Sequence, residues 1–472
     1  MPRPKSRTPD ARNETLTPTL SLQGEGAETL TPTLSLQGEG VQPLSRRDVL
    51  GLGAGSAFAL ATPAVAAQQA LPSSSRQLWS WARSQQVLEP GLAWFDTARM
   101  GPTLRGVLVN EYRARELLNM DFREYSRRSF DPDAIAALVG TVAGAVGAEV
   151  DEIAFTIGAS GAIDAAVHGL ELEAGDEVIT TSHDHRSVAG AWVQRAARDG
   201  IVLRRVELPS PLTGPEQPLG MIAGAVTDRT RVISFAHVQY TDGALLPARE
   251  ICAFARQRGI LTIVDGAQAL GMIDLSLGDL GCDCYAASLH KWVNAAYGTG
   301  LLYVRRDSLE RVHPLEADAT DATTDVLADP ADPRADWPAA MRRYGHAYRY
   351  FGPLFQPVDS LLGFRNQIGR ERIEARIREL AIYARLRLQA VAGVEIVTPA
   401  APGLWGGILS LRIAAPEATD LAAALAAEDR VIVGVVRDPR GEGALLRVST
   451  HIYNTHDEIE RLVRGLQRRV GA

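Results

Sequence analysis

The fold of this chain is decided by two stretches of its sequence, Leu261-Thr262-Ile263-Val264-Asp265-Gly266-Ala267-Gln268 and Cys284-Tyr285-Ala286-Ala287-Ser288-Leu289-His290-Lys291-Trp292. Each begins with a short apolar run and ends in polar side chains. Such runs are typical of buried strands in a parallel sheet, and the side chains that follow the carboxyl ends of these strands gather at one edge. The sequence therefore predicts that the two polar endings share one site.

The same alternation of short apolar runs and amphipathic helices extends over residues 80–345. It predicts an α/β domain with a mostly parallel, seven-stranded sheet. The predicted strands are Glu152–Thr156, Glu177–Thr181, Val202–Glu207, Arg231–Ala236, Leu261–Val264, Cys284–Ser288 and Leu301–Val304. A stretch rich in Pro and Asp, Ala317–Pro338, is predicted to form an exposed loop.

The pattern over residues 346–472 predicts a smaller α+β domain. We expect the N-terminal part of the large domain to pack on it. The pattern opens with a long helix over Gln367–Val391. Strands and helices then alternate. The predicted strands lie near Gly407–Ile413, Val431–Val436 and Leu445–Ser449, and the predicted helices cover Thr419–Glu428 and Asp457–Arg469.

The composition is that of a globular enzyme that acts on small molecules. With 472 residues, of which 46% are hydrophobic, the chain can bury a substantial core. A net charge of -7, with acidic and basic residues interspersed, argues against nucleic-acid binding. The only cysteines are Cys252, Cys282 and Cys284, which excludes a disulfide framework and a four-cysteine zinc site. No metal site is predicted.

The beginning of the chain contains a duplication. The segment Glu14–Gly26 recurs without change as Glu28–Gly40. Two copies are too few and too polar to form a solenoid. We therefore predict that residues 1–44 are a disordered, low-complexity extension.

Residues 45–67 resemble a twin-arginine export signal. Arg46 and Arg47 precede a Gly/Ala-rich apolar run, which ends in the small residues Ala64-Val65-Ala66. The resemblance implies passage through the twin-arginine export machinery and a periplasmic or secreted protein. The alternative is an uncleaved anchor, but the run is short for a bilayer span, and no stable membrane association is predicted.

The polar endings of the two opening stretches resemble the VDGAQ and SxHK signatures of class V pyridoxal phosphate (PLP) enzymes. The resemblance implies that Lys291 carries PLP as a Schiff base and shuttles a proton. It also implies that Asp265 keeps the pyridine nitrogen of PLP protonated and that Gln268 hydrogen-bonds the phenolic oxygen. A lone lysine would be read as a solvated surface residue, but the joint pattern favours the catalytic interpretation.

Small residues at a helix start predict where the phosphate of PLP binds. Ile153–Gly161 reads as a strand, a tight turn and a helix. The free N–H groups at a helix N-terminus bind phosphate, so we expect Ala159 and Ser160 to do so. Ser288 and His290 are the expected side-chain partners. Such a turn alone more often serves packing and capping, but its order relative to the other signatures favours a phosphate site.

The segment Asp184-His185-Arg186-Ser187 resembles the EHxS segment of the same family. This implies that the His185 imidazole stacks on the pyridine ring of PLP. The alternatives are an exposed loop histidine and a metal ligand paired with His183. The metal alternative lacks a third suitably spaced ligand.

The segment Leu446–Thr455 resembles the RxSxHxYN strand of the family. It implies that Arg447 binds the α-carboxylate of the substrate, because a guanidinium matches that planar anion. The alternative is a surface arginine.

The resemblance covers Asp96 to Arg469 and implies a PLP-dependent transferase of fold type I that forms a homodimer. It is closest to the branch of isopenicillin N epimerase-like and cysteine desulfurase-like proteins. No cysteine lies between Trp292 and Arg447, so a persulfide-forming desulfurase is not expected. This chain departs from the family pattern at two places. Tyr240 stands where the family commonly has asparagine. Gly345-His346 stands where the family has a Gly-Thr or Gly-Gly pair that reaches the PLP phosphate of the neighbouring subunit.

The predicted function is PLP-dependent conversion of an amino acid or amine, by an aminotransferase or an epimerase. Lys291 is the only evident general base, so abstraction of the α-proton is the step that the residues support. Where the proton returns distinguishes transamination, epimerisation and elimination. The alternatives are a carbon–sulfur lyase and a catalytically silent scaffold with the PLP fold.

Overall fold

The structure is a computed structural model that describes residues 71–129, 131–315, 338–345, 355, 357–441 and 443–470. All of them belong to one structural unit, Ala70–Ala472. The predicted extension over 1–44 and the predicted export signal over 45–67 lie outside the described residues. So do residues 317–337 of the predicted loop, and His346.

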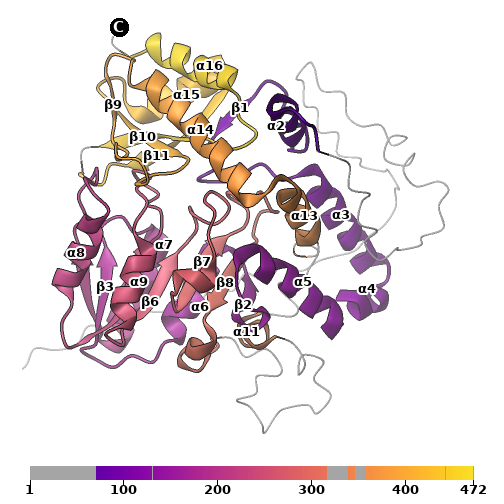
Figure 1. The fold of residues 1–472 in the computed structure, drawn as a ribbon, viewed down its shortest axis with the longest axis vertical. Helices are drawn as coiled ribbons and strands as arrows, with labels where there is room; N and C mark the ends of the chain where they lie inside the picture. Colours follow the sequence, from indigo (N-terminus) through magenta and orange to yellow (C-terminus); the bar gives the residue numbers. More distant parts are fainter. Residues whose placement is uncertain are drawn as a thin grey trace, which may run out of the picture. The chain divides into compact units, whose positions relative to one another are not determined.

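The large sheet has seven strands in the order β2-β8-β7-β6-β5-β3-β4 (Figure 1). They are β2 (Ile153–Thr156), β3 (Glu177–Thr181), β4 (Val202–Val206), β5 (Thr230–Ala236), β6 (Leu261–Asp265), β7 (Cys284–Ser288) and β8 (Gly300–Val304). Strands β3 to β7 run parallel to one another, whereas β8 is antiparallel to β2 and β7. The predicted, mostly parallel seven-stranded sheet is confirmed, and each strand end lies within one residue of its predicted position.

Burial explains why these strands could be recognised in the sequence. Every residue of β2, β3, β6, β7 and β8 is buried. A strand that is covered on both faces has an almost continuous apolar run. The helices along this part of the chain are α6 (Gly158–Gly169), α7 (Arg186–Asp199), α8 (Glu216–Ala225), α9 (Ala248–Arg256), α10 (Leu277–Leu280) and α11 (Ala339–Tyr344), with the 3-10 turns η1 (Val150–Glu152) and η2 (Arg306–Arg311). Helix α6 packs on β7 and β8, which puts its N-terminus beside the end of β7.

The N-terminal segment contributes a strand to the second sheet. Its elements are α2 (Ser75–Ser84), β1 (Ala93–Phe95), α3 (Arg105–Met120), α4 (Phe122–Ser129) and α5 (Pro132–Val146). Strand β1 runs parallel to β11 (Val431–Arg437), with Ala93 opposite Val431 and Phe95 opposite Val433. Both residues of β1 that make these pairs are fully buried. The chain that leaves β1 at Asp96 therefore starts from the small sheet and reaches the large one.

The small sheet has five strands in the order β1-β11-β12-β10-β9 (Figure 1). Beside β1 and β11 they are β9 (Val394–Ile396), β10 (Ile408–Ile413) and β12 (Ala444–Ser449). The helices of this region are α13 (Val358–Ile368), α14 (Arg370–Leu388), α15 (Ala418–Asp429) and α16 (His456–Gln467). Strand β9 is missing from the prediction, because three partly exposed residues at a sheet edge leave no apolar run.

The helix predicted over Gln367–Val391 is present as α14, but its predicted start is wrong. Helix α13 ends at Ile368 and α14 begins at Arg370, and Gly369 between them has a φ of 93°. Glycine reaches this left-handed region without the steric penalty that a Cβ would bring. Because apolar residues recur at helical spacing on both sides of Gly369, the pattern alone did not reveal the break.

Two clusters of buried side chains form the interior. The larger one fills the large sheet and its helices and continues into the small sheet. The second cluster surrounds Trp292, which is fully buried, and joins residues from segments that are far apart in the chain. Its other members are Ala82, Ala98, Val238, Ala269, Met272, Ile368, Ile373, Ile377, Ile408 and Ile452.

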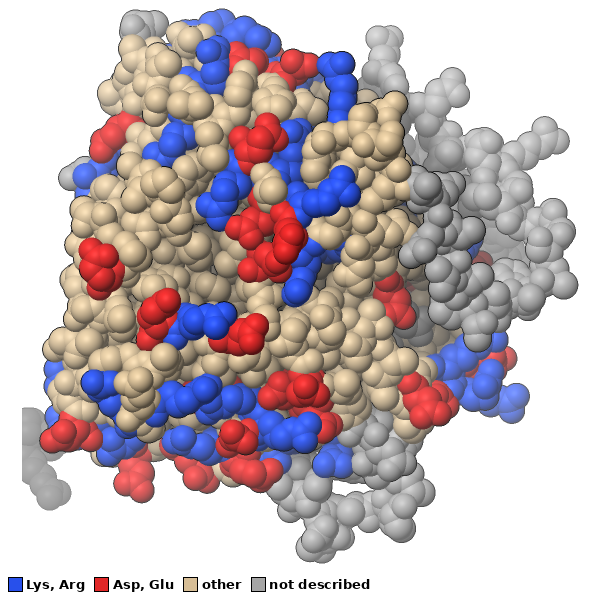
Figure 2. All heavy atoms as spheres, viewed as in Figure 1, with Lys and Arg blue, Asp and Glu red and all other residues tan. Residues whose placement is uncertain are grey.

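The face of the molecule drawn in Figure 2 carries acidic and basic side chains side by side rather than one block of a single sign. Among the described residues, no single helix is long and apolar enough to cross a membrane. One bent pair of helices, Phe122–Ser129 with Pro132–Val146, meets the length and composition criteria.

We predict that Gly266→Ala destabilises the fold by about 1–3 kcal/mol, the usual range for overpacking a core. A Cβ at Gly266 would overlap the ring of Tyr285, which is fully buried and cannot swing away. The matched control is Gly144→Ala in the exposed face of α5, where a Cβ meets nothing within 4 Å. That change should be neutral or stabilising by up to about 1 kcal/mol. Urea unfolding midpoints of the two variants check this, and equal midpoints would contradict it.

Candidate active site

The polar residues that follow the strands meet around two adjoining cavities. The outer one is open, measures about 540 Å³, and is lined by eight of the predicted site residues. These are Ala159, Ser160, His185, Gln268, Ser288, His290, Lys291 and Arg447. Asp265 lines the inner one, of about 40 Å³, together with Lys291 and His185. The structure thus brings all the predicted site residues together.

The start of helix α6 is shaped to receive an anion. Gly158 has a φ of 75°, and a Cβ there would stand 3.3 Å from the His290 ring. The N–H of Ala159 is not free as predicted, because it donates to the Ser288 hydroxyl over 3.0 Å, whereas Ser160 is exposed toward the cavity. Hydroxyl groups and helix N–H groups around a glycine turn are a donor set that suits a phosphate group.

His290 can donate to a phosphate only in its charged form. Its Nδ1 lies 3.1 Å from the carbonyl oxygen of Thr299, so Nδ1 carries the proton that this bond requires. In the neutral ring, Nε2 then has no proton to give. Burial lowers the pKa of His290, whereas a nearby dianion would raise it. The predicted phosphate contact of His290 therefore requires that the phosphate raise the pKa of His290 enough to protonate the ring.

The carboxyl group of Asp265 lines the inner cavity, and that of Asp184 is near enough for the two charges to interact. Asp265 ends strand β6, and its Oδ1 accepts the N–H of Ala267 over 2.9 Å. Asp184 accepts the N–H of Thr181 over 2.7 Å and its hydroxyl over 2.8 Å. Burial raises the pKa of Asp184 to about 7, and the charge of Asp265 acts in the same direction. A carboxylate at Asp265 is the partner that a protonated pyridine nitrogen needs.

His185 is held as a neutral ring at the start of helix α7. Its Nδ1 accepts the N–H of Ser187 over 3.2 Å and lies 2.8 Å from the Ser187 hydroxyl. The proton of the neutral ring is therefore on Nε2. Burial lowers the pKa of His185, and the charge of Lys291 lowers it further. The ring of Tyr240 meets it edge-on, with the centroids 5.0 Å apart.

The alternative of a metal pair with His183 finds no support in the described part of the chain. His183 is buried, and its ring nitrogens lie 2.8 Å from the Thr241 hydroxyl and 3.2 Å from the Leu208 carbonyl. Within the described ranges, no group of three or more His, Cys, Asp and Glu side chains could hold a metal ion. His185 is also only partly exposed, unlike a free loop histidine.

Lys291 follows strand β7 in a tightly packed segment. Burial lowers the pKa of its amine to about 8, and the charge of Arg447 acts in the same direction, whereas Asp265 raises it. The N–H of Gly101 donates to the His290 carbonyl over 2.9 Å, and a side chain at Gly101 would overlap the Lys291 carbonyl. With a pKa of about 8, roughly a tenth of this amine is neutral, and nucleophilic, at pH 7, far more than of an exposed lysine.

Gln268 has a second set of partners that the sequence did not reveal. Its Oε1 accepts the indole N–H of Trp292 over 2.8 Å, and its Nε2 donates to the Ala98 carbonyl over 2.8 Å. An amide nitrogen carries two protons, so one N–H of Gln268 is left for a ligand. The predicted contact with the phenolic oxygen of PLP stays a prediction, and it has to use that proton.

The carbonyl of Trp292 accepts hydrogen bonds from two side chains, an arginine and a histidine. Arg365 Nη1 and His451 Nε2 each lie 3.0 Å from it, and Arg365 Nη2 donates to the Gly271 carbonyl over 2.8 Å. Arg365 is almost completely buried, has no carboxylate partner among the described residues, and burial lowers its pKa to about 10. Burial also lowers the pKa of His451 to about 3, so this ring stays neutral.

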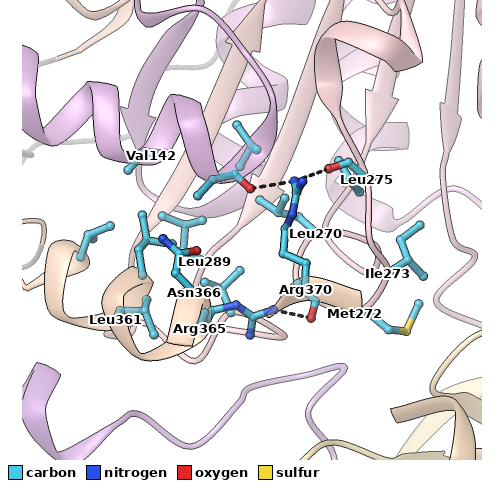
Figure 3. A pocket seen from close by; sticks show the side chains of 16 residues that line it. Val142, Leu270, Met272, Ile273, Leu275, Leu289, Leu361, Arg365, Asn366 and Arg370 are labelled. Atoms are coloured by element: carbon cyan, nitrogen blue, oxygen red, sulfur yellow. Dashed lines mark hydrogen bonds between the residues drawn. The ribbon is translucent and has the colours of Figure 1, made fainter. Parts of the chain in front are cut away.

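Figure 3 shows Arg365 at a further cavity, which shares no lining residue with the two cavities of the candidate site. It measures about 50 Å³ and lies beside Leu289 and Val293, which flank the Lys291 segment. The described residues that line it include no carboxylate, thiol or histidine. With no group for chemistry in its lining, we regard this cavity as a packing gap behind the candidate site.

Arg447 is buried rather than at the surface, and it is not free. Its Nη2 lies 3.0 Å from Asp96 Oδ1, and its Nη1 donates to the Tyr240 carbonyl over 3.1 Å. Side-chain exposures are 6% for Arg447 and 4% for Asp96. The alternative of a surface arginine is therefore wrong, and the predicted carboxylate site has an acidic member that the sequence did not reveal.

We predict that Arg365→Met destabilises the fold by about 1–3 kcal/mol, because the carbonyls of Trp292 and Gly271 lose a charged donor in a buried place. The matched control is Arg370→Met. Arg370 binds the carbonyls of Ala145 and Leu275 (Figure 3), but its side chain is 43% exposed, so its loss should shift stability by less than about 1 kcal/mol. Urea unfolding midpoints measure both, and a larger loss at Arg370 would refute the assignment.

Comparisons with known proteins agree with this geometry. The family model described as Aminotransferase class-V matches residues 133–462. The isopenicillin N epimerase of Amycolatopsis lactamdurans is 35% identical over 398 residues, which cover 82% of this chain and 98% of that protein. That of Streptomyces clavuligerus is 30% identical, covering 83% and 98%. A cysteine desulfurase of Cronobacter sakazakii is 29% identical, covering 67% of this chain and 78% of that protein.

Among solved structures, a mutant of C-DES with glycine covalently linked to the PLP cofactor has a TM-score of 0.72. It is 21% identical, covering 82% of this chain and 99% of that chain. At this level of identity the likeness supports the fold alone, and the fold is the type I architecture that the sequence predicts.

Proposed function

This chain belongs to the class V aminotransferase family, and we propose that within it the protein is a PLP-dependent epimerase of amino acids. The cofactor, pyridoxal 5'-phosphate, follows from the family. The observation that carries the proposal is a lysine amine with a pKa of about 8 that shares a cavity with a carboxylate, a phosphate-type turn and an arginine. The similarity to isopenicillin N epimerases over 98% of their length favours epimerisation.

The residues at the cavities fit PLP. The turn at Gly158 offers donors to a phosphate, and Asp265 offers a carboxylate to a pyridine nitrogen. When bound, PLP supplies an aldehyde that condenses with amines and a ring that withdraws electrons from the bond to be broken. His185, neutral and partly buried, is suited to cover one face of that ring.

Lys291 is the proposed base that removes the α-proton. Its amine is partly neutral near pH 7 because burial lowers its pKa to about 8. The carbonyl of Trp292, the residue after Lys291, is hydrogen-bonded by Arg365 and His451. These bonds fix the backbone from which the Lys291 side chain enters the cavity. A fixed base with a matched pKa is what proton transfer requires.

An epimerase must return the proton to the opposite face of the α-carbon, and Tyr240 is the proposed donor. It lines both cavities, and its hydroxyl forms no hydrogen bond with any residue that the structure describes. Burial raises the pKa of Tyr240, so the phenol keeps its proton at neutral pH. Tyr240 also stands where the family commonly has asparagine. The amide of asparagine donates hydrogen bonds but does not give up a proton as an acid.

The cysteines argue against formation of a persulfide. All three are buried, and burial raises the pKa of Cys252 to about 12 and that of Cys284 beyond the usual range. A thiol has to reach the substrate as a thiolate to attack sulfur. None of the three lines either cavity of the site.

We also propose export and a homodimer. The paired arginines Arg46 and Arg47 support passage through the twin-arginine route to the periplasm or beyond. Exposed apolar side chains at the cavity mouth, Ile157 at 54% and Tyr297 at 68%, support a second copy of the chain at that edge.

The proposed reaction is tested by incubating the holoenzyme with single enantiomers of amino acids in deuterated water. An epimerase yields the other enantiomer with deuterium at the α-carbon. An aminotransferase yields keto acid in amounts that rise with an added amino acceptor, and a carbon–sulfur lyase releases ammonia without one. Either of the last two results would overturn epimerisation.

The pH dependence of cofactor uptake tests the role of Lys291. Only the neutral amine attacks an aldehyde, so the rate of PLP uptake by apoenzyme should rise with pH through a midpoint near 8. Asp265→Asn removes the carboxylate that raises this pKa, so the midpoint should move to lower pH. The control Asp228→Asn alters an exposed acid and should leave the midpoint in place. A midpoint near that of free lysine would contradict the assignment.

The variant Tyr240→Phe tests the second proton donor. Inversion should fall at least about 100-fold, as is usual when a general acid is lost, while Lys291 continues to exchange the α-proton for solvent deuterium. Chiral chromatography and mass spectrometry measure the two rates. Tyr112→Phe, an exposed tyrosine of α3, is the control. Loss of both rates together would show that Tyr240 has another role.

A further inference from the structure

The arginine that the sequence predicts as the carboxylate site already has a carboxylate beside it. Asp96 Oδ1 lies 3.0 Å from Arg447 Nη2, and both side chains are almost fully buried. Burial lowers the pKa of Arg447, and Asp96 opposes that shift. The positive charge of Arg447 is therefore compensated before any ligand arrives.

This pair is built into the small sheet. Asp96 directly follows β1, and Arg447 lies on β12 opposite Gly434 of β11. A Cβ at Gly434 would stand 2.6 Å from Asp96 Oδ1 and 3.2 Å from Arg447 Nε. The missing side chain leaves the space in which the pair forms. Since neighbouring strands fix both partners, the guanidinium has one position.

Arg447 keeps unused donors. A guanidinium has five N–H groups, and those bonded to Asp96 and to the Tyr240 carbonyl leave others free. Its Nε is buried and has no hydrogen-bond partner among the described residues. A ligand carboxylate can therefore bind Arg447 while Asp96 stays. Two carboxylates on one guanidinium, however, need another positive charge to balance them.

Arg99 is placed to supply that charge. It follows Asp96 by three residues, in the turn where the N–H of Arg99 donates to the Asp96 carbonyl over 3.0 Å. It lines the same open cavity as Arg447, and its side chain is exposed there. Its guanidinium forms no ion pair with any residue in the described ranges, and its charge acts on that of Arg447.

We propose that Arg99, Arg447 and Asp96 together form the anion subsite, with one net positive charge that accepts a single carboxylate. This rests on the proposed function, in which the cavity binds an amino acid. Arg99 and Arg447 bind the carboxylate. Asp96 fixes Arg447 and repels a second negative charge at the same point. The substrate class is then an amino acid that presents one carboxylate, not a pair of adjacent ones, to this end of the cavity.

The test measures binding of two simple acids, propionate and succinate, to the holoenzyme by calorimetry. Arg99→Gln should weaken propionate binding about five- to tenfold, a moderate effect because the side chain is exposed. Asp96→Asn changes the net charge of the subsite from one to two positive charges. It should raise the affinity for succinate relative to propionate about tenfold, the effect of one more unopposed positive charge near a surface. Arg113→Gln, an exposed arginine of α3 outside the cavity, should change neither constant.

Two results would overturn the proposal. One is an unchanged ratio of succinate to propionate affinity in Asp96→Asn. The other is unchanged propionate binding in Arg99→Gln, and faster loss of PLP from that variant would then assign Arg99 to the phosphate. Because binding is measured without turnover, an inactive protein with the expected binding changes would refute the proposed epimerase and leave this subsite standing.

Discussion

The rest of the site depends on how the peptide after Lys291 is held. The Trp292 carbonyl accepts from Arg365 of α13 and from His451 just beyond β12, and the Trp292 indole donates to Gln268. These partners come from three separate parts of the chain and meet at one fully buried residue. A lysine that has to meet a ligand aldehyde cannot sit on a mobile loop, and this arrangement fixes its segment against both sheets.

The same burial has opposite effects on stability and on reactivity. Placing Arg365 in the interior without a carboxylate among the described residues carries a desolvation penalty, which its hydrogen bonds to the Trp292 and Gly271 carbonyls oppose. Around Lys291, burial and the charge of Arg447 together hold the pKa near 8, where a neutral amine is available. A more solvated segment would be easier to stabilise, but the neutral fraction of its lysine near pH 7 would be far smaller.

Much of the fold was predictable because buried parallel strands have their own pattern in the sequence. All seven strands of the large sheet and the convergence of Asp265, His185 and Lys291 followed from it. What the sequence could not reveal are partners that are backbone atoms or that come from distant segments. The carbonyls held by Arg365 are of the first kind, and Asp96 beside Arg447 is of the second. The break at Gly369 was missed because the apolar spacing continues across it.

The measurement that tests the central claim most directly is reduction of the holoenzyme with borohydride, followed by peptide mass spectrometry. Reduction locks PLP onto the amine that carries it. If the account is right, the pyridoxyl mass appears on the peptide that contains Lys291, and on no other. Label on another lysine, or no label in a protein that has bound PLP, would contradict it.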